Sequence, residues 1–98
     1  PAVILVYSQA HGAAASSTFP GVQNLLLAAR ALGVGSVLTT LHAEVMERVN
    51  AIFGVPDDMV FHCCLPLGYP RGNFGPTSRL PTSETTSWGR WGTPPPWK

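Results

Sequence analysis

Apolar and polar positions divide the chain into a patterned region up to about residue 68 and an unpatterned remainder. Residues 2–7, AVILVY, form a continuous apolar run rich in branched side chains, which predicts a central strand buried on both faces. Residues 59–65, MVFHCCL, predict a second, mostly buried strand that ends at Pro66, because proline cannot donate to a strand ladder.

A first helix is predicted over residues 20–32. Pro20 suits the first turn of a helix, and Gly33 suits the position just past its end. Residues 8–18 are small or polar and show no period, so they predict a loop.

A second helix is predicted over residues 43–53, because apolar residues recur on one face and Gly54 follows. Glu44 and Arg48 are spaced as an i, i+4 ion pair on its other face. Between the helices, residues 36–40, SVLTT, predict a short extended segment.

The first helix is apolar nearly all round, and its strongly polar residues are only Gln23, Asn24 and Arg30. Such a helix has to be covered on nearly all sides, and a chain of 98 residues has too few other elements to do this alone. Further sequence or a second subunit is therefore required.

From Gly68 onward the chain is rich in prolines and turn formers and has no helical period. It cannot form a core of its own. Large aromatic side chains usually cover a surface, so we expect an arm docked on another body. The aromatic residues concerned are Trp88, Trp91 and Trp97.

Composition narrows the possible partners. Charged residues make up 11% of the chain against a usual quarter, which predicts a surface that binds something. The longest apolar runs are far shorter than the roughly 20 residues that span a bilayer, so a protein partner is expected and a membrane is not. Nothing at the start of the chain directs secretion, which favours the cytoplasm.

Charge is divided along the chain. Residues 1–70 hold two arginines against four carboxylates, whereas residues 71–98 hold three arginines and a lysine against one glutamate. This basic remainder suits an anionic ligand at one or two points better than a nucleic-acid stripe.

No catalytic side chain is predicted. The hydroxyls near His11 lack a GxSxG turn and a partner carboxylate, and the paired acids at 44 and 47 and at 57 and 58 suit solvated faces. His42 is expected to cap a helix or lie in solvent, and His62 to be a satisfied core histidine.

No metal site is predicted either, because no spaced Cys/His set is present. Cys63 and Cys64 are adjacent, so a bond between them would be strained and both are expected as buried thiols. Arg79, within GPTSRLP, is a candidate for binding phosphate oxygens, with a plain solvated arginine as the alternative.

Three segments in this order resemble the C-terminal portion of an FMN-dependent nitroreductase-family subunit: 19–40 (FPGVQNLLLAARALGVGSVLTT), 65–70 (LPLGYP) and 74–81 (FGPTSRLP). The resemblance implies an α+β fold with a mixed or antiparallel sheet, packed helices and an extended C-terminal arm. Residues 1–81 would be part of the nitroreductase-like domain, and residues 82–98 the arm.

The resemblance also implies a homodimer with FMN at the subunit interface. NAD(P)H would reduce FMN, which would then reduce a nitroaromatic, a quinone or a similar small-molecule acceptor, the chemistry belonging to the flavin. The helix at 23–32 would lie near the dimer core, which would account for its apolar surface. The alternative is a non-catalytic truncated homologue that acts as a dimerisation or interaction module.

By position, Thr39, Thr40 and Leu41 match the segment beside the flavin ring, with the backbone N–H of Thr40 bonding the N5 edge. Arg79 matches the residue that holds the FMN phosphate, whereas Thr77 departs from a pattern that has a second basic residue there. The family's N-terminal half of the site has no counterpart before Pro1, so activity is expected only where that half is supplied.

Overall fold

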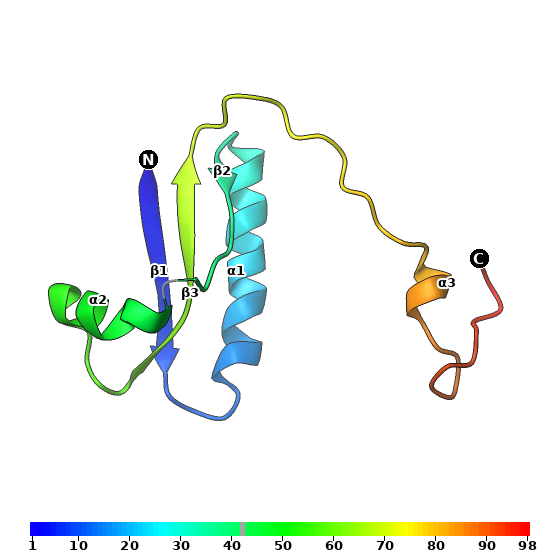
Figure 1. The fold of residues 1–98 in the computed structure, drawn as a ribbon, viewed down its shortest axis with the longest axis horizontal. Coiled ribbons are helices and arrows are strands. Elements are labelled where there is room, and N and C mark those ends of the chain that lie inside the picture. The colour runs from blue at the N-terminus through cyan, green and yellow to red at the C-terminus, as the bar shows by residue number, and fades with distance from the viewer. Residues whose placement is uncertain (42) are drawn as a thin grey trace.

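The computed structural model describes residues 1–41 and 43–98 and contains a three-stranded antiparallel sheet in the order β1-β3-β2 (Figure 1). The strands are β1 (Ala2–Gln9), β2 (Gly35–Ser36) and β3 (Met59–Gly68). The prediction of a central, doubly buried first strand is wrong. β1 lies at an edge of the sheet, where Val3 is 62% exposed, and β3 takes the centre.

The central strand β3 runs through Pro66 to Gly68, so the prediction that proline ends it is also wrong. The backbone groups of Cys64 point toward β2, because Cys64 exchanges two hydrogen bonds with Thr39, at 2.8 and 2.9 Å. Those of Pro66, two residues further on, face the same side. The N–H that Pro66 lacks would therefore have bonded on the β2 side. The pairing of β3 with β1 continues past Pro66.

This missing donor explains why β2 is short. Gly35 pairs with Gly68 and Ser36 with Leu67, and the same register resumes only at the bridge between Thr39 and Cys64. The gap lies opposite Pro66. The predicted extended segment is confirmed in this interrupted form.

Helix α1 (Ala14–Ala31) begins well before Pro20, so the predicted loop is too long. The alanines ahead of Pro20 are strong helix formers, and they outweigh the single hydrogen bond that an internal proline removes. The predicted end is confirmed: Gly33 has φ 75°, and the N–H of Val34 bonds the carbonyl of Ala29 at 2.8 Å in a Schellman turn.

One face of the sheet packs on α1. Val22, Cys63 and Leu65 form the buried cluster, at 4%, 0% and 0% exposure, and partly buried residues surround it: Ile4, Val6, Leu25 and Leu26. The other side of α1 stays open, since Leu27 is 58% exposed. The sequence predicts that nearly all sides of α1 are covered, and the described residues leave this side exposed.

The second predicted helix is present as a 3₁₀ turn, η1 (Ala43–Val45), followed by α2 (Met46–Phe53). Gly54 ends it with φ 63°. Glu44 and Arg48 make no ion pair with each other, because the 3₁₀ turn changes the i, i+4 spacing. The expectation for His42 falls outside the described residues.

Helix α2 is held to the sheet by a hydrogen bond from the Tyr7 hydroxyl to Asn50 Oδ1, at 2.8 Å. Side chains alternate along a strand, so Tyr7 projects from the face opposite to Val6 and α1. The sheet is therefore flanked by one helix on each face.

Beyond β3 the chain leaves this body at residue 69, so the extended part is longer than the expected 82–98, and residues 69–98 are called the arm from here on. The arm contains one helical turn, α3 (Thr82–Thr85) (Figure 1). That turn was not predicted. The radius of gyration is 18.0 Å, against about 13 Å for a compact chain of 100 residues. At the far end, Trp88 and Trp97 pack edge to face with ring centroids 5.4 Å apart, and Pro95 is buried.

Candidate functional site

The segment at residues 39–41 is held by the centre of the sheet. Thr39 is bridged to Cys64, which is 7% exposed, and the N–H of Leu41 donates to Thr39 Oγ1 at 3.2 Å. The N–H of Thr40 makes no hydrogen bond with a described residue. Thr40 itself is exposed and lies next to the bridged residue Thr39.

The Thr40 N–H is thus a backbone donor without a described partner, next to a residue that the sheet holds by two hydrogen bonds. A donor held by the sheet bonds an acceptor atom without reorganising, which is what electrostatic preorganisation requires. Its neighbour Leu41 is 92% exposed and offers an apolar side chain beside it. The arrangement suits the edge of a planar, partly apolar ring that carries an acceptor.

Arg79 lies on the exposed stretch between β3 and α3, and its guanidinium makes no hydrogen bond or ion pair with a described residue. The segment that carries it stands away from the sheet and α1 (Figure 1). The structure therefore brings Thr39, Thr40 and Leu41 together and leaves Arg79 apart from them. Its role with phosphate stays a prediction.

Thr77 lines an open hollow of about 460 Å³ between α1 and the start of the arm. The Arg30 guanidinium lies 4.9 Å from the centre of the Phe74 ring at this hollow, and this contact holds the first part of the arm near α1. At its wall, a Cβ on Gly35 would approach the carbonyl oxygen of Gly68 to 3.1 Å. Because glycine has no Cβ, Gly35 allows β2 to pair closely with β3 here.

The structure brings together a serine and a histidine whose contact was not predicted from the sequence. Ser8 Oγ lies 2.7 Å from His62 Nε2, and the ring of Phe19 packs edge to face on the imidazole at 5.7 Å. His62 sits where the register between β1 and β3 shifts, and this irregularity turns it toward Ser8. From the sequence, His11 was the histidine considered, because it is near the serines along the chain. The contact with His62 depends on an irregularity in strand pairing, which no local sequence pattern predicts.

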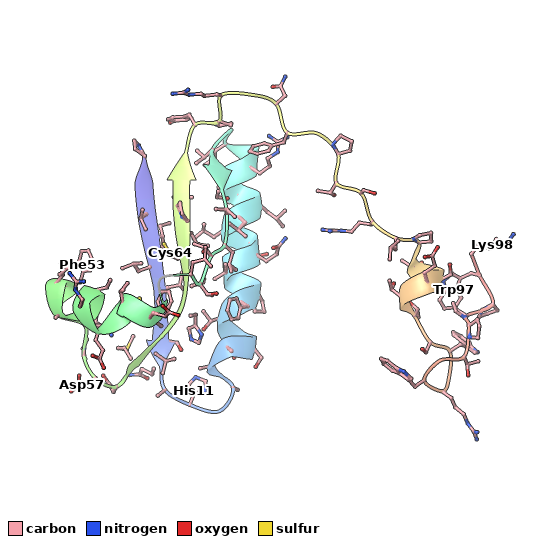
Figure 2. All side chains as sticks on the ribbon, viewed as in Figure 1. His11, Phe53, Asp57, Cys64, Trp97 and Lys98 are labelled. Carbon is pink, nitrogen blue, oxygen red and sulfur yellow. The ribbon has the colours of Figure 1, made fainter. Side chains whose placement is uncertain are left out.

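No described carboxylate contacts His62, so the pair lacks the third group that would orient a general base. His62 has a hydrogen-bonding partner, as predicted, but it is half-buried and not part of the core. Figure 2 shows all the described side chains, and within residues 1–41 and 43–98 no group of three potential ligands is placed to hold a metal ion. No helix in the same residues is long and apolar enough to cross a membrane.

The two cysteines are confirmed as buried, free thiols. Burial raises the pKa of the Cys63 thiol above its ordinary value, and the adjacent Cys64 raises it further.

The fold is shared with solved structures. An NADH dehydrogenase/NAD(P)H nitroreductase of Bacteroides thetaiotaomicron superposes with a TM-score of 0.79 at 24% identity, over 91% of this chain and 55% of that one. Iodotyrosine deiodinase, solved with FMN and 3-iodo-L-tyrosine, gives 0.65 at 25% identity, over 93% of this chain and 46% of that one. The chain therefore has a nitroreductase-like α+β fold and forms part of that domain.

The model of the Nitroreductase family matches residues 2–69, and the chain belongs to this family. Relatives named NADH dehydrogenase/NAD(P)H nitroreductase share 38% identity over 55 residues in Methanothermobacter thermautotrophicus and 39% over 51 residues in Archaeoglobus fulgidus. These matches span 54% and 50% of this chain and 29% of each relative. The chain thus corresponds to less than two thirds of each of them.

Proposed function

We propose that the chain is the C-terminal part of an FMN-dependent oxidoreductase that takes electrons from NAD(P)H and passes them to a nitroaromatic, a quinone or a similar acceptor. Family membership supports an oxidoreductase. The FMN in the deiodinase structure supports the cofactor, and the names of the archaeal relatives support the nicotinamide donor.

The N–H of Thr40, which bonds no described residue, is the observation that carries this proposal. FMN, when bound, supplies the hydride and electron transfer. The chain's own part is to orient and hold: Thr40 donates a hydrogen bond to the N5 edge of the ring, beside Thr39 and Leu41. Arg79 lies apart from this segment in a single chain, so it binds the phosphate of an FMN at the interface with a second subunit. The open face of α1 packs on a second subunit in a homodimer. The homodimer is cytoplasmic.

A second candidate is a non-catalytic homologue that serves as a dimerisation or interaction module. One observation favours it: Leu27 and Leu32 on α1 are 58% and 79% exposed, which leaves an apolar helix face for another protein. Such a chain would associate through α1 without binding flavin.

Flavin titration separates the two candidates. Thr40→Pro removes the N–H, whereas Thr40→Ala keeps it, so we expect only the proline variant to lose reduction of bound FMN by NAD(P)H. Arg79→Gln should weaken FMN binding by about tenfold and leave riboflavin binding unchanged, because riboflavin has no phosphate.

Arg71→Gln is the matched control, since Arg71 lies on the same arm outside the matching segment. The titrations use protein in which the N-terminal half of the site is supplied, and failure to take up FMN there supports the interaction module. Equal losses of FMN and riboflavin affinity in Arg79→Gln would contradict the phosphate role.

A further inference from the structure

A second hollow, of about 580 Å³, lies where the end of α1 and the start of the arm meet at one end of the sheet (Figure 1). We call it the arginine hollow, because Arg30 of α1 and Arg71 of the arm both line it. Tyr69, Asn73 and Phe74 also line it, and no described carboxylate does. Small-molecule sites have volumes of roughly 300–1,000 Å³, so the hollow has room for a ligand larger than a single ion.

The protein does not neutralise the two guanidinium groups of the arginine hollow. Among residues 1–41 and 43–98 neither group makes an ion pair or a hydrogen bond, and Arg30 contacts only the face of the Phe74 ring. Residues 59–83 contain no carboxylate, and the acids at 57 and 58 lie at the opposite end of β3. The hollow therefore carries two positive charges that an anion can neutralise.

The end of α1 at this hollow does little to repel an anion. Unpaired carbonyl groups at the end of a helix carry partial negative charge, which disfavours anions there. In α1 the carbonyl groups of residues 28–30 accept hydrogen bonds from the N–H groups of residues 32–34, in the turn that Gly33 permits. The two arginines are therefore the dominant charges of the hollow.

The donors of the arginine hollow suit a phosphate monoester. A guanidinium presents paired N–H groups that fit two oxygens of one phosphate. A phosphate monoester carries a charge of about −1.5 to −2 at pH 7, which matches two arginines, whereas a carboxylate matches one. The Asn73 amide adds further donors. Tyr69 and Phe74 are 86% and 53% exposed, and their rings offer faces on which a base can stack.

We propose that the arginine hollow binds the phosphate monoester of a nucleotide, with Arg30 and Arg71 holding the phosphate and Tyr69 beside the base. The site is separate from Arg79, which does not line the hollow and which the proposed function assigns to FMN. Two ligands carry this group: NADPH, through its 2′-phosphate, and a free nucleoside monophosphate. The NADPH assignment rests on the proposed function, and the phosphate site itself does not.

Calorimetric titration with AMP tests the site. The protein has the N-terminal half of the flavin site supplied and is loaded with FMN, so that AMP cannot enter the flavin site. We expect AMP to bind about tenfold more tightly than adenosine, which lacks the phosphate. Arg71→Gln and Arg30→Gln should each remove about tenfold of the AMP affinity, because each removes a charge-assisted hydrogen-bond donor. Arg90→Gln is the matched control, since Arg90 is on the arm and outside the hollow.

These variants should keep the fold and the bound flavin. Arg71 contacts no described residue and lies outside the proposed flavin site, so Arg71→Gln should load with FMN as the unaltered protein does. Arg30→Gln loses the contact with Phe74, and circular dichroism checks that α1 is retained.

The same titration with NADP⁺ and NAD⁺ distinguishes the two ligands. Binding of NADP⁺ about tenfold more tightly than NAD⁺, with the difference lost in Arg71→Gln, would identify the 2′-phosphate of NADPH. Equal binding of both, with AMP binding still dependent on Arg71, would identify a free nucleoside monophosphate. Either result supports the phosphate site.

AMP that binds no more tightly than adenosine would overturn the proposal. So would AMP affinities that are equal in the unaltered protein, Arg71→Gln and Arg30→Gln. AMP that displaces bound FMN would also overturn it, because the phosphate would then lie in the flavin site. A protein that takes up no FMN is titrated with AMP directly, so a failure of the proposed function is distinguishable from a failure of this site.

Discussion

The body at residues 2–68 and the arm at residues 69–98 are stabilised in different ways. In the body, the middle of β3 is buried, and Leu65 is completely removed from solvent. In the arm, residues 87–97 are held by local hydrogen bonds and by the edge-to-face contact between Trp88 and Trp97, whereas Trp91 is exposed to solvent. The body can therefore unfold cooperatively, whereas the arm needs a surface supplied by another molecule to become part of a core.

The largest expected contrast comes from truncating one leucine in each region. Leu65→Ala opens a cavity in the buried cluster and should lower the free energy of unfolding by about 2–5 kcal/mol. Leu80→Ala, at a site 67% exposed on the arm, should change it by less than about 0.5 kcal/mol. Urea denaturation measures both, and similar losses would mean that the arm packs as part of the core.

A matched pair of glycines gives a smaller contrast. Gly33 and Gly92 have φ of 75° and 82°, and a Cβ at either position would meet no atom within 4 Å. Gly33→Ala should cost about 1 kcal/mol because it strains the end of α1. Gly92→Ala should leave the unfolding of the body unchanged and alter only the tryptophan fluorescence. A shared loss of stability would show that the two regions unfold together.

The smallest effect concerns alkaline pH. The folded state keeps Cys63 protonated because its pKa is raised above the ordinary 9.0, so ionisation favours the unfolded chain as pH rises past that value. The free energy of unfolding should fall over that range, and less steeply in Cys63→Ala. The arm contains no cysteine, so its fluorescence should show no transition from this source. An equal slope in both proteins would exclude this cause.

Local sequence was sufficient for features that depend on local energetics. The end of α1 at Gly33 and the α2 stop at Gly54 were predicted, because a positive φ selects glycine whatever surrounds it. The buried thiols were predicted from an apolar run. The resemblance predicted the α+β fold, which the matched structures confirm.

Features that depend on neighbours in space could not be predicted in this way. An apolar run does not reveal whether a strand is central. The first strand was therefore predicted at the centre of the sheet, where β3 lies. The side of β3 on which Pro66 lacks a donor follows from the pairing with Thr39, which no local pattern contains. The contact between Ser8 and His62 requires a bulge, and the separation of Arg79 from Thr40 depends on where the arm goes.

The two outer edges of the sheet differ in their exposure to unwanted strand pairing. Pro66 splits the β2 edge into short pieces, which makes it a poor template for another extended chain. The outer edge of β1 pairs with no other strand of the described chain, and its eight residues, AVILVYSQ, combine strong β propensity with no charge. Preparations of the chain should therefore begin to aggregate at the β1 edge, and a charged residue in place of Val3 should delay it.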